Sequence, residues 1–207
     1  GNTTTYTYDD NGNRLTETRM RTTWTGVETL VTRYAYDVAN RLVQTTDALG
    51  NISRTEYNAI GKESARIDPL GRRTQFEYDA RGNLARTVYP DGTSETTAYD
   101  AENHKISSTD RAGRVTQYAY DKVGNLTKTT FPDGSFTQTE YDAAGRAVRN
   151  IDQRGNATVY EYDAAGRNTA VTDALGNRTE YAYSAGDNRT AMRDARGNVT
   201  QYAYDAM

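Results

Sequence analysis

The sequence predicts an all-β protein built from 21-residue repeats, each contributing two antiparallel strands to a continuous curved or spiralling sheet, part of a hollow shell. Three observations support this fold class. A tyrosine followed by a small polar residue recurs at a fixed period, two glycine-containing turns divide each period, and the segments between the turns are rich in Thr and Tyr, which are favoured in strands.

The period is set by tyrosines that recur at a constant spacing. From Tyr36 to Tyr204 this spacing holds over eight spans without a slip. The ladder consists of Tyr36, Tyr57, Tyr78, Tyr99, Tyr120, Tyr141, Tyr162, Tyr183 and Tyr204. Asp follows most of these tyrosines, while Asn58 and Ser184 follow the other two. Fixed-period self-similarity is the sequence signature of a repeat architecture. We therefore expect residues 1–207 to form a single array, a fragment of a longer protein.

Each repeat contains two turns, the first directly after the ladder tyrosine and the second about ten residues later. An Asp that accepts a backbone N–H two residues ahead, followed by a Gly that tolerates positive φ, explains both turns. The glycines of the second turn form a ladder of their own: Gly50, Gly71, Gly92, Gly113, Gly134, Gly155, Gly176 and Gly197.

Between the turns the residues alternate, as in 198–204, where Thr and Tyr occupy one set of positions and polar residues or Ala the other. This period of two indicates a strand with a Thr/Tyr face. If a four-residue loop joins neighbouring strands, Tyr78 stands opposite Asn83 and shares its face with Ala85 and Thr87.

The ladder tyrosines are predicted to lie too far apart to stack on one another. Equivalent strands are two apart, about 9.6 Å, whereas aromatic pairs prefer centroid separations of about 4.5–7 Å. We expect aliphatic side chains such as Val148 and Val171 to fill the space between the rings.

The composition excludes several other classes of protein. Ile, Leu, Val and Phe number only 27 of 207 residues, yet the net charge of −3 is too small for a disordered chain of that kind. This near-neutral charge gives no reason to expect a nucleic-acid partner. No apolar run approaches the ~20 residues of a membrane span, and the first residues do not resemble a signal peptide. The predicted number of strands affects the shape of the sheet. About eighteen strands exceed the ~10 that an open twisted sheet usually holds, so the sheet is expected to curve around a space.

The Tyr-Asp-x-x-Gly-Arg/Asn and Asp-x-x-Gly-Asn ladders resemble the Rhs/YD-repeat family over essentially the whole chain. The resemblance implies a sheet that spirals into a β-cocoon. In bacterial Rhs polymorphic toxins and toxin-complex components this shell encloses a C-terminal toxin domain, and in animal teneurins a similar shell belongs to an adhesion protein. It implies a structural, secreted or cell-surface bacterial protein whose partners are the encapsulated toxin domain and the flanking repeats.

The resemblance leaves one part of the family unmatched. The family's core segment, which plugs the shell, has no counterpart here, because the Asp68–Gly71 stretch is in register with the ordinary second turns. No autoproteolytic aspartates are therefore transferred to this chain. Loss of flanking repeats exposes edge strands, which predicts an edge-strand homodimer.

No catalytic, cofactor-binding or metal-binding residues are expected. The abundant carboxylates have turn roles, and the lone His104, in a turn, is expected to be solvated and has no accompanying nucleophile pattern. A calcium site remains an alternative for one row of second-turn aspartates, although Tyr89 and Phe131 interrupt it. That row consists of Asp47, Asp68, Asp110, Asp152, Asp173 and Asp194.

The unit that begins at Tyr8 is longer than the others, which predicts an extended hairpin over about residues 15–34 with its turn near Thr25-Gly26. The hairpin carries Trp24, the only tryptophan. Packing of the indole against a neighbouring strand is favoured over a role as a contact anchor at an exposed tip. A second function class also stays open for the chain. It is an extracellular carbohydrate-binding or adhesion module in which exposed tyrosines and turn Asn and Asp bind glycans.

Overall fold

The computed structural model describes residues 2–205, which contain nineteen strands and no helix. The strands are β1 (Thr3–Tyr8), β2 (Arg14–Thr23), β3 (Gly26–Tyr36), β4 (Leu42–Thr46), β5 (Ile52–Tyr57), β6 (Glu63–Ile67), β7 (Arg73–Tyr78), β8 (Leu84–Val88), β9 (Ser94–Tyr99), β10 (Lys105–Thr109), β11 (Val115–Tyr120), β12 (Leu126–Thr130), β13 (Phe136–Tyr141), β14 (Ala147–Ile151), β15 (Ala157–Tyr162), β16 (Asn168–Thr172), β17 (Arg178–Tyr183), β18 (Arg189–Arg193) and β19 (Val199–Gln201). The predicted fold class, an all-β array of 21-residue repeats with two antiparallel strands each, is confirmed.

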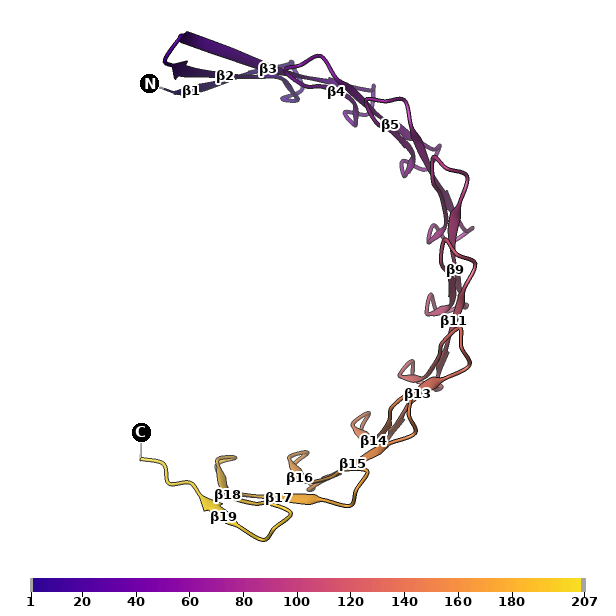
Figure 1. Ribbon diagram of the computed structural model, residues 1–207, viewed down its shortest axis with the longest axis vertical. Helices are drawn as coiled ribbons and strands as arrows, with labels where there is room; N and C mark the ends of the chain where they lie inside the picture. Colours follow the sequence, from indigo (N-terminus) through magenta and orange to yellow (C-terminus); the bar gives the residue numbers. More distant parts are fainter. Residues whose placement is uncertain (1, 206–207) are drawn as a thin grey trace. The chain divides into compact units, whose positions relative to one another are not determined.

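The chain divides into two compact units, residues 1–97 with 110–113, and residues 98–109 with 114–207. Within each unit the strands follow one another in chain order and pair antiparallel, as β5 does with β6 and β15 with β16 (Figure 1). No helix in the described part of the chain is long and apolar enough to cross a membrane.

Both turns of a repeat have the same geometry, a three-residue loop closed by a left-handed residue. After β7, the N–H of Asp79 donates to the carbonyl of Asn83 and the N–H of Gly82 donates to the carbonyl of Asp79, each at 2.9 Å. After β16, Asp173, Gly176 and Asn177 make the same two bonds, each at 3.0 Å. This is the three-residue hairpin loop in which a type I turn is followed by a bulge.

The bulge corrects the predicted register of the first hairpin. Tyr78 lies opposite Leu84 rather than Asn83, and the register shifts between Glu77 and Tyr78. The three-residue loop closed by Gly82 accounts for the pairing of Tyr78 with Leu84, and the further shift leaves Ala85 unpaired in β8. Thr87 lies opposite Phe76, two residues before Tyr78, so the predicted Thr/Tyr face is present.

The sheet has almost no interior of its own. Among the described residues the only buried hydrophobic side chains are Ala65 and Ala170, at 0% and 1% exposure. Each alanine lies in the middle strand of three, opposite Glu56 in one case and Glu161 in the other. Arg73 and Arg178 on the next strand reach these glutamates with two hydrogen bonds each, and so cover the alanines. A flat, charged cover of this kind explains how the chain folds with few aliphatic residues.

The hairpin formed by β2 and β3 is longer than the others, with strands of 10 and 11 residues (Figure 1). Thr23 pairs with Gly26, so the turn consists of Trp24 and Thr25, one residue earlier than predicted. Trp24 is 98% exposed. The favoured interpretation, in which the indole packs against a neighbouring strand, is therefore wrong.

Candidate functional site: the tyrosine ladder

The ladder tyrosines occupy one structural position. Tyr36 ends β3 and each of the next seven ends the strand before a first turn, while Tyr204 follows β19. All eight glycines of the second-turn ladder have φ between +77° and +86°. In three first turns Asn40, Asn103 and Asp187 take this left-handed conformation in place of glycine, with φ of 58°, 67° and 63°.

The tyrosine hydroxyls tie each repeat to the preceding one. Seven of them donate to a backbone carbonyl 15 residues upstream at 2.8–3.1 Å, and the acceptor is always the first residue of a strand. The donors are Tyr57, Tyr78, Tyr120, Tyr141, Tyr162, Tyr183 and Tyr204. Tyr36 donates in the same way to the carbonyl of Arg14, at 3.1 Å. Each hydroxyl therefore joins two directly paired strands, β5 and β4 in the case of Tyr57, and links the tyrosine to the residue that follows the first turn of the preceding repeat.

The aspartate after the tyrosine organises the first turn. Asp163 Oδ1 accepts the N–H groups of Ala165 and Arg167 at 2.9 and 3.0 Å, and Oδ2 accepts Arg167 Nε at 2.7 Å. The backbone N–H and the guanidinium of Arg167 hold the pKa of Asp163 below its ordinary value. At the one first turn where Ser184 replaces Asp, its Oγ accepts the equivalent two N–H groups at 3.3 and 3.2 Å. The carboxylate thus caps the turn and fixes the direction of the arginine.

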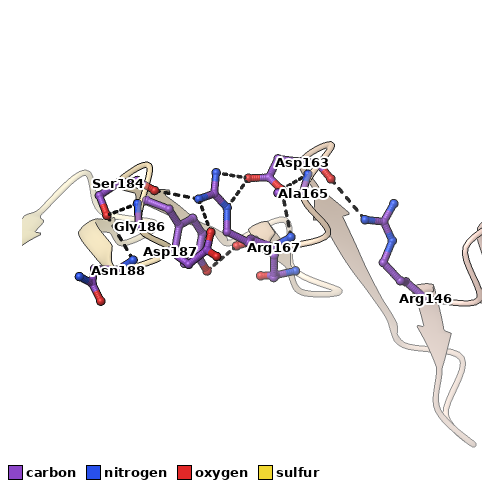
Figure 2. Close-up of polar contacts among 10 residues, drawn as sticks. Arg146, Asp163, Ala165, Arg167, Ser184, Gly186, Asp187 and Asn188 are labelled. Carbon is purple, nitrogen blue, oxygen red and sulfur yellow. Dashed lines mark hydrogen bonds and ion pairs between the residues drawn. The ribbon is translucent and has the colours of Figure 1, made fainter.

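The fixed arginine reaches the next repeat (Figure 2). Arg167 NH1 donates to the carbonyl of Ser184 and to Asp187 Oδ1, both at 2.9 Å, and its guanidinium lies 5.0 Å from the ring centroid of Tyr183. Arg146 makes the same kind of contact one repeat earlier, donating to the carbonyl of Asp163 at 3.3 Å. A turn residue of one repeat thus covers the ladder ring of the next.

Cations and one imidazole fill space between the ladder rings. The guanidinium or ammonium groups of Arg41, Lys62 and Arg146 lie 4.5, 5.2 and 4.7 Å from the centroids of Tyr57, Tyr78 and Tyr162. Such contacts contribute about 0.5–1 kcal/mol each at exposed positions. The sequence pattern predicted only aliphatic residues there. The signal that was missed is a basic residue directly after the left-handed residue of the first turn, one repeat before the tyrosine that it covers.

His104 belongs to this set, and the prediction that it is solvated is wrong. Its ring stacks on Tyr120 with a centroid separation of 4.7 Å, and its Nδ1 lies 3.1 Å from Asp100 Oδ2. The Asp100 carboxylate, the Glu102 carboxylate and His104 also form a cluster whose ligand atoms all lie within 4.8 Å of one another. These are residue types that bind divalent metals, but the Asp–His contact has the same role as the Asp–Arg contacts of neighbouring turns.

The aspartates of the row for which calcium was an alternative make turn contacts. Asp173 Oδ1 accepts the N–H groups of Leu175 and Asn177 at 2.9 and 2.8 Å, and its Oδ2 accepts Asn177 Nδ2 at 2.8 Å. Equivalent bonds occur at four other members of the row, Asp47, Asp68, Asp152 and Asp194. The carboxylates that cap these turns are already occupied by neighbouring donors.

The Tyr162→Phe substitution tests the hydroxyl ladder. It removes the bond to the carbonyl of Ala147, 2.9 Å long, and we expect the free energy of unfolding to fall by about 0.5–1.5 kcal/mol. Tyr160→Phe is the matched control, because the Tyr160 hydroxyl meets only Asn150 Nδ2, at 3.4 Å. Urea denaturation followed by circular dichroism measures both. Equal losses in the two variants would contradict the role of the ladder.

Comparison with known proteins identifies similar sequences and structures. The family model described as RHS Repeat matches residues 20–52, 57–94, 99–135, 141–167 and 168–199. No curated protein sequence matches significantly. A crystal structure of TcdB2-TccC3 without the hypervariable C-terminal region is similar at 18% identity and a TM-score of 0.53, over 94% of this chain and 11% of that one. The structure of TcdB2-TccC3 is similar at 17% identity and a TM-score of 0.50, over 98% and 15%. The chain thus spans a small part of each of these proteins.

Proposed function

Because the chain belongs to the RHS Repeat family, we propose that it is one section of the wall of a β-cocoon that encapsulates the C-terminal toxin domain of its parent protein. The observation that carries the proposal is the ladder itself. In repeat after repeat the same geometry of Tyr, Asp and Gly is used for turns and for bonds to the neighbouring repeat. The proposed activity is therefore mechanical containment, and the chain contributes no catalysis of its own.

The ladder supplies what a thin wall requires. In a repeat protein, stability is approximately the sum of the repeats and of their nearest-neighbour contacts. Here the contacts are a tyrosine hydroxyl on the preceding repeat and a cation on the following ring, as Tyr162 and Arg146 illustrate. Neither contact needs a second layer of protein, so one face of the sheet remains available to enclosed material. A secreted or cell-surface bacterial protein is the proposed setting.

Protection of the cargo tests the proposal. In the parent protein, we expect limited proteolysis to spare the segment C-terminal to the repeats, and to cleave it when Gly145→Val and Gly166→Val loosen two turns together. Mass spectrometry of the fragments gives the readout, with Gly145→Asn and Gly166→Asn as the paired control. Cleavage of that segment at the same rate in the unaltered parent protein and in the loosened variant would refute encapsulation.

Two surfaces supply further proposed contacts. All six residues of β1 are exposed, and in the described chain β1 pairs only with β2, so we propose that it pairs with a flanking repeat or, in the isolated segment, with a second copy. Trp24 and Val27, 98% and 67% exposed, form the proposed contact tip for a glycan or an adhesion partner. A monomeric mass by light scattering would oppose the homodimer, and an empty glycan array would oppose the glycan.

A further inference from the structure

A cavity lies within the first compact unit. It has a volume of about 740 Å³ and is lined by residues of β5, β6 and β7 and of the turns after β6, β8 and β10. Ligand pockets usually measure about 300–1,000 Å³. Four arginines contribute to its wall, namely Arg54, Arg66, Arg72 and Arg111.

The cavity forms where the repeat departs from its own pattern. Tyr89 stands at the second-turn position that Asp occupies in most repeats. The guanidinium of Arg111 lies 4.3 Å from the Tyr89 ring centroid, while the Tyr89 hydroxyl donates to Glu95 Oε2 at 2.9 Å. Arg111 Nε also donates to Thr93 Oγ1 at 2.9 Å. This side of the cavity is therefore held by contacts of both the ring and the guanidinium, and no other repeat in the described chain has a tyrosine at this second-turn position.

The hydrogen-bonding capacity left in the cavity belongs to donors. Asp68 accepts from Leu70 N, Arg72 N and Arg72 Nε at 3.0, 2.9 and 2.6 Å. Asp91 accepts from Thr93 N and Oγ1 at 3.0 and 2.6 Å, and from Arg111. Each of the two lining carboxylates thus already accepts three hydrogen bonds, whereas each guanidinium carries five N–H groups, of which these bonds use only some.

The charge of the residues that line the cavity agrees with this excess of hydrogen-bond donors. Four arginines and two aspartates give a formal charge of +2. Guanidinium groups match the planar fork of a carboxylate and also bind phosphate. Glu63, outside the lining, ion-pairs with Arg66, and an excess of positive charge remains in the cavity. The ligand chemistry is therefore anionic.

We propose that this cavity binds an acidic peptide segment through its glutamate or aspartate carboxylates. Ile67, Pro90 and the ring of Tyr89 add an apolar side to the wall. The methylene groups of acidic side chains can pack on such a surface, which a free phosphate would leave unused. The proposal does not depend on encapsulation, because any acidic chain that reaches this face of the sheet meets the same donors.

The test uses isothermal titration of the whole chain with a capped hexaglutamate peptide, against hexaglutamine. We expect one hexaglutamate to bind per chain, with an affinity that weakens as salt is added, and no binding of hexaglutamine. The double variant Arg66→Thr/Arg72→Asn should weaken binding at least about tenfold, because it removes two cavity charges. Equivalent positions carry Thr87 and Asn51 in other repeats, so both substitutions preserve a turn and a strand that this chain already forms.

A charge-matched control separates the cavity from general attraction. Arg154→Ala/Arg196→Ala removes two charges at turn positions outside the cavity, where another repeat carries Ala112, and should change the affinity less than about twofold. Circular dichroism establishes that the variants are folded. The proposal is overturned if hexaglutamate does not bind, if both double variants weaken binding equally, or if equimolar inorganic phosphate displaces the peptide.

Discussion

Acidification from pH 6 to pH 3 is expected to lower the free energy of unfolding steeply, with the loss beginning near pH 4. Fourteen aspartates have a folded-state pKa below the ordinary value, chiefly because the turn donates hydrogen bonds to the carboxylate: Asp9, Asp37, Asp47, Asp68, Asp79, Asp91, Asp100, Asp121, Asp133, Asp142, Asp152, Asp163, Asp173 and Asp194. At Asp68 and Asp100 burial acts most strongly and raises the pKa, but the hydrogen bonds together outweigh it.

The direction in which the stability changes with pH follows from proton linkage. A carboxylate whose pKa is lower in the folded state stabilises the fold above its unfolded pKa of about 3.9, and that contribution is lost as the pH falls through the folded value. Between pH 5 and 7 these groups should therefore leave the stability nearly constant. Each carboxylate is at least partly exposed and contributes little alone, but fourteen losses in the same pH window add together.

Urea denaturation at pH 2.5–7, followed by circular dichroism, measures this profile. Asp142→Ser/Asp163→Ser provides the matched variant, because Ser184 already caps an equivalent turn without a titrating group. We expect the double variant to be less stable at pH 6 and to lose less on acidification. An unfolding free energy that stays constant from pH 6 to pH 3 would contradict the capping role of the aspartates.

The Gly145→Val substitution is expected to cost about 1–2 kcal/mol of stability, from backbone conformation alone. Gly145 has φ of +76°, and a Cβ built there meets no atom within 4 Å. A Cβ at this position thus makes no steric contact with the surroundings. A β-branched residue is strongly disfavoured in the left-handed region, so valine must either strain the turn or open it.

Gly145→Asn is the control for this prediction. Asn40 and Asn103 hold the same turn position at positive φ in other repeats, so asparagine should cost less than half as much as valine. Both variants are measured by urea denaturation at pH 7. If asparagine and valine cost the same, the left-handed conformation would not be what selects glycine here.

The regular period was sufficient to predict the strands, because turn chemistry and alternation are local properties of the sequence. It was not sufficient for the register of the first hairpin. The position of Tyr78 opposite Leu84 depends on the bulge that the left-handed Gly82 creates. A second unpaired residue, Ala85, shifts the pairing of Glu77 to Arg86, and alternation of residue types predicts neither residue.

The contacts between repeats were harder to predict. The sequence located Tyr183 in the ladder, but its bond to the carbonyl of Asn168 and the approach of Arg167 depend on which strands are neighbours and how they are offset. The Tyr89–Arg111 pair has the same origin, because its two residues belong to different repeats and meet only in the folded sheet. Trp24 was misjudged because the two-residue turn directs it away from both strands.

The long hairpin of β2 and β3 shows how such a wall can acquire new attachments. Its repeat is longer than the others, yet Tyr36 still donates to the first residue of β2, as the other ladder tyrosines do to theirs. The added residues lengthen both strands at the end of the hairpin that is remote from the tyrosine bond. Insertions near second turns can therefore accumulate without altering the tyrosine hydrogen bonds. One repeat can diversify while its neighbours keep the wall intact.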